Sequence, residues 1–263
     1  MTTHIDKGIN YCKKRKAIVC NGKLAPGITS DLKKKFQPHW DIKKLVGLNP
    51  KAKKERRFRG SIKIGVGLDR QLIRSTRLVK KYAQMPNAVF YDNKIFLNFR
   101  AQLTNKKDKA ELTKLHKLKH PYHKNIFKTL DEEKFRIVDT QLPVGVAERV
   151  TTLDLVCTDQ KTRTKVAIRQ VKTGQESYFK ACSKPPYGRM EYPFSNRNDS
   201  IENLNQLQIT VEQHLYKLTY PENIPRMLPP AVYRCCTEGV LVHKQEQWVK
   251  DKEGLLMNIM LSK

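Results

Sequence analysis

The sequence predicts an α/β fold in which a mixed sheet is flanked by helices. Two observations support this. Short β-branched runs of alternating character lie in the middle of the chain, and segments with helical spacing of apolar residues lie before and after them. The 263 residues suffice for one large domain with an extension, or for two small domains. Apolar residues make up 39% of the chain, so it is poorer in core residues than an average enzyme.

We divide the chain into a basic N-terminal extension, residues 1–60, and a folded domain, residues 61–263. Three prolines interrupt the extension, at Pro26, Pro38 and Pro50. A long helical pattern is hard to sustain there, and we expect the extension to be ordered in part by its ligand. Phe36 and Trp40 are the side chains expected to dock it on the domain.

The pattern changes at Ile62. The stretch GVGLDRQLIRSTRLVKKYA predicts the first packed helix, because its apolar residues recur at helical spacings, at Leu68, Leu72, Ile73 and Leu78. A short hairpin is expected over AVFYDNKIFLNF, with Asp92 and Asn93 at its turn. The segment DKAELTKLHKLKH predicts a second helix, with leucines on one side at Leu112, Leu115 and Leu118.

Two further β-branched runs, LDLV and KVAIRQV, are separated by the turn-compatible stretch TDQKTRT. They predict an antiparallel hairpin. Asp154 would lie on its first strand, and Gln170, sixteen residues later, and Lys172 on its second. Side chains alternate along a strand, so Gln170 and Lys172 share a face. A carboxylate, an amide and an ammonium group are thus expected to converge.

The charge of the chain points to a polyanionic partner. It has 52 Lys and Arg against 25 Asp and Glu, a formal net charge of +27. Neutralisation of phosphates by such residues supplies most non-specific affinity for nucleic acid, so nucleic acid is the expected partner. A single basic run is as typical of a solvated surface or a localisation signal as it is of a binding site. Four runs in one segment favour a nucleic-acid-binding arm. The basic residues chosen for this role are Lys13, Lys14, Arg15, Lys16, Lys33, Lys34, Lys35, Lys53, Lys54, Arg56, Arg57 and Arg59.

Three blocks in the second half of the chain carry a family resemblance: TLDLVC, RQVKTG, and the helix-like NDSIENLNQLQITVEQHLYKL. With these blocks the chain resembles the PD-(D/E)XK nuclease superfamily. The likeness is greatest to its exonuclease-like branch, found in phages, recombination enzymes, mitochondrial genome maintenance exonucleases and large DNA viruses. DEEKFRIVDTQLPVG stands where relatives place a glutamate before a short strand. The resemblance covers roughly residues 115–220 and implies the family's mixed central sheet flanked by helices.

The resemblance also implies a chemistry. The family uses acidic side chains to hold one or two Mg²⁺ ions, or Mn²⁺, as Lewis acids for phosphodiester cleavage, with a lysine beside them. Asp154 would be the central metal ligand, the carbonyl of Val171 a second ligand and Gln170 a substituted third. Lys172 would be the catalytic lysine, and Gln141 matches the upstream glutamate.

Two amides depart from the family pattern. Replacing carboxylates at positions 170 and 141 removes up to two negative charges, so the metal affinity is expected to fall. A glutamine at the first of these positions is known among relatives, for example in the endonuclease subunit of a bacterial transposase. Glu148, six residues before Asp154, would lie on the same face of a continuous strand and compensate; alternatively it is a solvated charge at the strand edge.

The downstream helix has an apolar stripe at Leu204, Val211, Leu215 and Leu218. Gln208 falls within this stripe, and a buried amide requires hydrogen-bond partners. Either Gln208 reaches the site, as a glutamine on this helix does in relatives, or it is a core amide bonded to a strand carbonyl. The family's frequent tyrosine four residues later is absent, because Glu212 stands there.

Cysteine and histidine patterns predict no metal centre of their own. The six cysteines show no CxxC spacing, and a surface role is expected for His116, His120 and His123, whose basic neighbours would repel a cation. There is no signal peptide and no long apolar span, so we expect an intracellular protein without a membrane partner. Nucleus, mitochondrion and virion are all compatible with the sequence.

These patterns together predict a nucleic-acid-binding protein with a PD-(D/E)XK fold, DNA-directed, whose metal site is weakened or lost. The first alternative is an active Mg²⁺-dependent DNA exonuclease or endonuclease. The second is a basic structural component of a nucleoprotein particle with partner proteins. Acidic side chains near Asp154 would discriminate between the first two: two or more within metal reach favour the enzyme, and Asp154 alone favours the binding protein.

Overall fold

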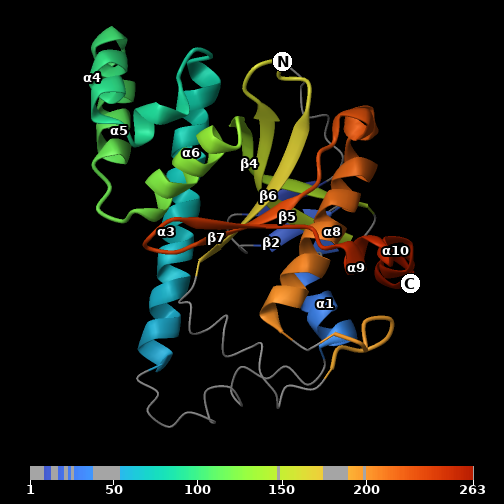
Figure 1. Ribbon diagram of the computed structural model, residues 1–263. Coiled ribbons are helices and arrows are strands. Elements are labelled where there is room, and N and C mark those ends of the chain that lie inside the picture. Colours follow the sequence, from blue (N-terminus) through green and yellow to red (C-terminus); the bar gives the residue numbers. More distant parts are fainter. Residues whose placement is uncertain are drawn as a thin grey trace.

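The computed structural model describes residues 9–12, 17–20, 23–24, 27–37, 54–146, 149–173, 189–197 and 200–262. Its centre is a five-stranded mixed sheet flanked by helices, as the sequence predicts (Figure 1). The strands, in their order across the sheet, are β4 (Phe135–Val146), β5 (Arg149–Asp159), β6 (Val166–Thr173), β7 (Ala231–Cys235) and β8 (Val240–Lys244). Neighbouring strands are antiparallel except for the parallel pair β6 and β7.

The predicted hairpin is formed by β5 and β6, with Leu155 opposite Arg169 and Thr158 opposite Val166. Its turn is organised by Asp159, whose carboxylate accepts the backbone N–H groups of residues 162 to 165. These bonds, first the one from the Lys165 N–H, hold the pKa of Asp159 well below its ordinary value. The turn thus fixes the register that places the two site strands side by side.

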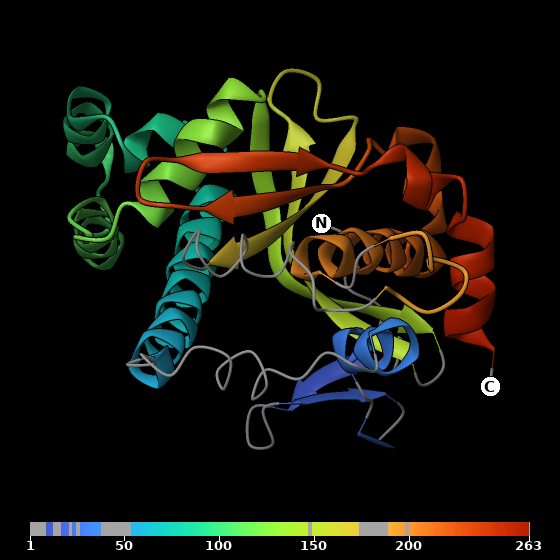
Figure 2. The same cartoon turned by 60° about the horizontal axis from the view of Figure 1, so that its bottom comes forward.

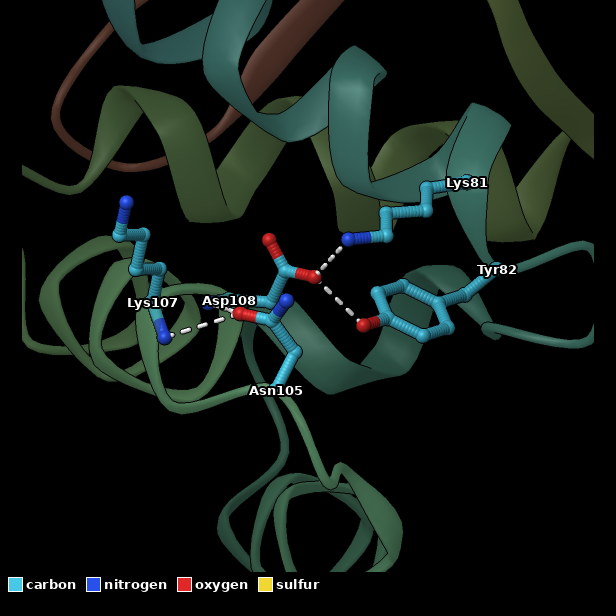
Figure 3. A network of polar contacts seen from close by, with 5 residues as sticks. All are labelled: Lys81, Tyr82, Asn105, Lys107 and Asp108. Carbon is cyan, nitrogen blue, oxygen red and sulfur yellow. Dashed lines mark hydrogen bonds and ion pairs between the residues drawn. The ribbon is translucent and has the colours of Figure 1, made fainter.

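The segment between residues 54 and 132 forms the hydrophobic core on one face of the sheet. It consists of α3 (Lys54–Lys81), η1 (Asn87–Phe90), α4 (Asn93–Gln102), α5 (Lys106–His116) and α6 (Tyr122–Glu132). Phe90, Phe127 and Tyr233 are fully buried in this core. The end of α3 is tied to α5 by Asp108, which accepts hydrogen bonds from Lys81 and from the Tyr82 hydroxyl (Figure 3).

The other face is covered mainly by α8 (Ile201–Thr219), α1 (Ile28–Phe36) and the C-terminal segment (Figure 2). That segment comprises α9 (Gln247–Lys250) and α10 (Glu253–Leu261), whereas η2 (Pro221–Arg226) follows α8 and has no buried residue. Leu32 and Phe36 of α1 are buried, and the Phe36 ring packs edge-on against Phe194 at 5.4 Å. The predicted docking by Phe36 is therefore confirmed, while Trp40 lies outside the described residues.

The predicted boundary between residues 60 and 61 falls inside a helix. Helix α3 begins at Lys54 and runs without a break through residues 60 and 61. The segment before it contains a small antiparallel sheet of β1 (Ile9–Cys12), β2 (Ala17–Cys20) and β3 (Lys23–Leu24). Helix α1 belongs to the core of the second face. The described parts of residues 1–60 therefore include elements of the folded body.

The predicted hairpin over residues 88–99 is wrong, because this segment forms η1 and α4. Asp92 is the N-cap of α4, and its side chain accepts the Ile95 N–H at 2.8 Å. Asp and Asn are favoured both in turns and at helix N-termini, so the Asp92-Asn93 pair was compatible with either structure. The helical spacing of Phe96 and Phe99 was the signal for the helix.

The surface role predicted for His116 and His123 is also wrong. His116 is buried, stacks on Phe96 at 3.9 Å and contacts the carbonyl oxygen of Val89. His123 is fully buried on α6, with Nε2 at 2.7 Å from the Ser75 hydroxyl. Both histidines are parts of the core.

Candidate functional site

The candidate site lies where β5 and β6 separate. Their ladder ends at the pair Leu155 and Arg169, so the same register places Asp154 beside Gln170. Beyond that pair, the Val171 N–H donates to the Asp154 side chain, at 2.8 Å from Oδ2, and not to a backbone carbonyl of β5. Gln170 and Lys172 both reach toward α8, as their spacing of two predicts. The predicted convergence on one face is present.

Gln141 also lies at Asp154. Its Nε2 donates to Asp154 Oδ1 at 3.1 Å, so both carboxylate oxygens of Asp154 hold a hydrogen bond. Gln141 has φ of 51°, in the left-handed region that non-glycine residues rarely adopt. Such strain, about 1–3 kcal/mol, is typical of functional sites. Burial raises the pKa of Asp154 against the opposing effects of Lys172 and these hydrogen bonds.

Helix α8 supplies the next group of contacts. The Lys172 ammonium donates to Gln208 Oε1 at 3.1 Å, and Gln208 Nε2 donates to Glu212 Oε1 at 2.8 Å. Gln170 Nε2 donates to the same Glu212 oxygen at 3.0 Å. Of the two readings of Gln208, the structure therefore shows the one in which it reaches the site.

Glu212 is a site residue that the sequence interpretation missed. It is 1% exposed, and burial, followed by the charge of Asp154, raises its pKa to about 8. Its Oε2 and the Oε1 of Gln170 are both buried and accept no hydrogen bond from any residue that the structure describes. The available signal was its spacing of four from Gln208, which puts both on one helix face.

Asp69 of α3 is the second acid that sequence analysis missed. Burial, and then the charge of Asp154, raises its pKa to about 7. Helix α3 approaches the end of β6 closely at Gly65, where an added Cβ would lie 3.0 Å from Thr173 Oγ1. The signal in the sequence was an acid immediately after the core residue Leu68 and three residues before the core residue Leu72, on a packed helix.

The three lysines of α1 differ in their surroundings. Burial and the positive charge of Lys172 lower the pKa of Lys33, so this predicted nucleic-acid contact lies within the electrostatic reach of the site. Lys35 donates to the carbonyl of Ile259, whereas Lys34 is exposed.

The remaining residues predicted for nucleic-acid binding lie outside the part of the chain that the structure describes. Whole residues are outside it at Lys13, Lys14, Arg15, Lys16 and Lys53, and only the side chains at Lys54, Arg56, Arg57 and Arg59. Glu148, the predicted compensating acid, is also outside it.

The donor set at the site fits a divalent cation. Hard cations bind carboxylate, amide and backbone carbonyl oxygens, which Asp154, Glu212, Gln170 and Val171 offer here. Within the described ranges no three His, Cys, Asp or Glu side chains are grouped closely enough to hold a metal ion by themselves. Amide and carbonyl oxygens would therefore have to complete the coordination of Mg²⁺ or Mn²⁺.

No described helix is both long enough and apolar enough to cross a membrane. The cysteines that the structure describes at the side-chain level, Cys157, Cys235 and Cys236, are free thiols.

No protein-family model matches this chain, and no curated protein sequence matches it.

Proposed function

We propose that this chain is a nucleic-acid-binding protein with a PD-(D/E)XK nuclease-like site and a preference for DNA. The observation that carries the proposal is the convergence of Asp154, Gln170 and Lys172 on the face covered by α8, with Lys172 held by Gln208. The net charge of +27 supports a polyanionic ligand. Lys172 would place a fixed positive charge beside a bound phosphate.

Helix α3 offers a surface for the phosphate backbone. Five of its exposed basic residues, Lys63, Arg70, Arg74, Arg77 and Lys81, recur at spacings of seven, four, three and four. At 3.6 residues per turn these side chains fall within a stripe about 60° wide. We name them the α3 basic stripe. Two members also contact acids, Arg74 with Glu111 and Lys81 with Asp108, which reduces their net contribution.

The salt dependence of binding tests this function. Fluorescence anisotropy with labelled single-stranded DNA, duplex DNA and RNA should show affinity falling steeply with salt. Replacing Arg70 and Arg77 with Gln should reduce the slope of log K against log salt by about 0.7–0.9 per lost contact. Lys250→Gln, an exposed residue of α9, is the matched control and should leave the slope unchanged.

An affinity independent of salt, or slopes equal in the stripe variant and the control, would contradict the proposed surface. Point substitutions are preferable to deletion of residues 1–60. Deletion would remove the buried side chains of α1 together with the first turns of α3.

A second candidate function is metal-dependent phosphodiester cleavage, favoured by the two acids on helices near Asp154. A bound divalent cation would act as a Lewis acid on the phosphate and lower the pKa of an attacking water. The residues Asp154, Gln170, Val171 and Glu212 would hold it, and Lys172 would stabilise the developing charge.

End-labelled single-stranded and duplex DNA with Mg²⁺ or Mn²⁺ provides the assay. Asp154→Ala and Lys172→Ala should each abolish cleavage and leave nucleic-acid binding nearly intact. A wild-type protein that binds DNA but does not cleave it with either ion would leave only the binding function.

A further inference from the structure

We propose that Glu212 of α8 supplies the second carboxylate of a divalent-cation site, with Oε2 as its ligand atom, in place of the acid that β6 lacks at Gln170. This inference rests on the proposed function, because it concerns the same site. It identifies the second carboxyl group that the two strands do not provide.

The hydrogen bonds of Glu212 leave one oxygen available in a fixed position. Its Oε1 accepts from both amides, Gln170 at 3.0 Å and Gln208 at 2.8 Å. Its Oε2 is buried and has no hydrogen-bond donor among the described residues. Two bonds to one oxygen orient the carboxylate, so little further ordering is required when the second oxygen binds a ligand.

The amide of Gln170 is oriented by the same contact. Its nitrogen points to Glu212, because the opposite orientation would bring two oxygen acceptors together. Its Oε1 is therefore also left without a donor in the described part of the chain, and the residue is only 1% exposed. A buried acceptor without a partner costs free energy, because its bond to water is lost and not replaced. A cation bound between these two oxygens would remove that cost from both.

The charge and the donor types match a hard cation. Asp154 and Glu212 contribute two carboxylates, the Glu212 carboxyl releasing its proton to water when the cation binds, and Gln170 and the Val171 carbonyl contribute neutral oxygens. The Lys172 ammonium donates to Gln208 Oε1. Glu212 thus restores the number of carboxylates that a glutamate at position 170 would give.

An exchange of the two side chains tests this assignment. Calorimetric Mn²⁺ titration would compare the full-length wild type with Glu212→Gln, Gln170→Glu and the double exchange Gln170→Glu/Glu212→Gln. Glu212→Gln should weaken Mn²⁺ binding by at least about tenfold. The double exchange should recover most of this loss, because it returns a carboxylate to the same contact, and Gln170→Glu alone should bind more tightly than the wild type.

Glu202→Gln is the control on the same helix, since the Glu202 carboxylate lies at His243 instead, 3.4 Å from Nδ1. Its Mn²⁺ affinity should equal that of the wild type. Circular dichroism establishes that each variant is folded. If Glu212→Gln does not fold, the comparison of Gln170→Glu with the double exchange replaces it, and removal of Glu212 should again weaken binding.

Equal Mn²⁺ affinity in wild type and Glu212→Gln, or a double exchange as weak as Glu212→Gln, would overturn the inference. No Mn²⁺ binding by the wild type would overturn it too. Anisotropy measured without divalent ions keeps the proposed function separate: DNA binding without Mn²⁺ binding rejects only the role of Glu212. Mn²⁺ binding that depends on Glu212, without DNA binding, rejects only the proposed function.

Discussion

Replacing His123 with phenylalanine should make the protein less sensitive to acid. The imidazole is fully buried, edge-on to Phe90 at 5.4 Å and tilted against Phe127 at 5.0 Å. Its Nδ1 is buried without a hydrogen-bond partner among the described residues. A phenyl ring suits this environment, and Ser75 keeps its hydrogen bond to the carbonyl of Gln71 at 3.0 Å.

The magnitude follows from the pKa of His123, which burial, and secondarily the charge of Lys124, lowers from 6.5 to about 3. Above pH 6.5 the ring is neutral in both folded and unfolded protein, so it contributes no pH dependence. As the pH falls below 6.5 the unfolded chain binds a proton and the folded protein does not. The free energy of unfolding therefore decreases by about 1.4 kcal/mol per pH unit, or about 3 kcal/mol between pH 6.5 and 4.5.

Urea denaturation at pH 7.0, 5.5 and 4.5 measures this effect. The wild type should lose about 3 kcal/mol more than His123→Phe over that range, which isolates the histidine from other titrating groups. His120→Gln, a half-buried histidine two residues before α6, is the control and should follow the wild type. Parallel pH profiles for wild type and His123→Phe would show that the folded protein accommodates the charged ring.

Two other substitutions have defined outcomes. Arg136→Met should destabilise the protein by about 2–4 kcal/mol in urea denaturation, because its guanidinium donates to four carbonyl oxygens at the end of α3, those of Val79, Tyr82, Ala83 and Met85. Arg136→Lys, with fewer donors, should recover only part of the loss. An Arg136→Met variant as stable as the wild type would refute the stabilising role of these hydrogen bonds. Asp69→Asn should be more stable than the wild type at pH 8 but not at pH 4, because the raised pKa of Asp69, about 7, lowers wild-type stability as the pH rises from about 4 to 7. A gain that is the same at both pH values would contradict it.

The strand part of the site was predictable because strand periodicity is local. A spacing of two puts Gln170 and Lys172 on one face wherever the strand lies, and the turn at Asp159 fixes its pairing with β5. Local patterns did not distinguish a turn from a helix cap at Asp92, since one side chain can serve both structures. They also did not show that His116 and His123 are buried, because lysines on the exposed side of each helix surround them in sequence.

The two acids were harder to predict because helices bring them to the site. Asp69 lies on α3, which packs with the core of one face, and Glu212 lies on α8, which packs with the core of the other. Their pKa values respond to the same charge, that of Asp154, at the point where β5 and β6 separate. That meeting is a product of tertiary packing, so no window of sequence around the strands contains it.

This arrangement changes the meaning of the two glutamines. In the strand motif alone, Gln141 and Gln170 stand where carboxylates are expected, so the motif has less negative charge and predicts a weaker cation site. In space, each amide donates a hydrogen bond to a carboxylate, Gln141 to Asp154 and Gln170 to Glu212. An amide that donates from its nitrogen orients the acid and leaves its own oxygen for another ligand. The further carboxyl groups near Asp154 therefore come from the helices, from Glu212 and Asp69, and not from the strand motif. Burial raises their pKa values to about 8 and about 7, so a cation that binds near neutral pH would have to displace protons from them.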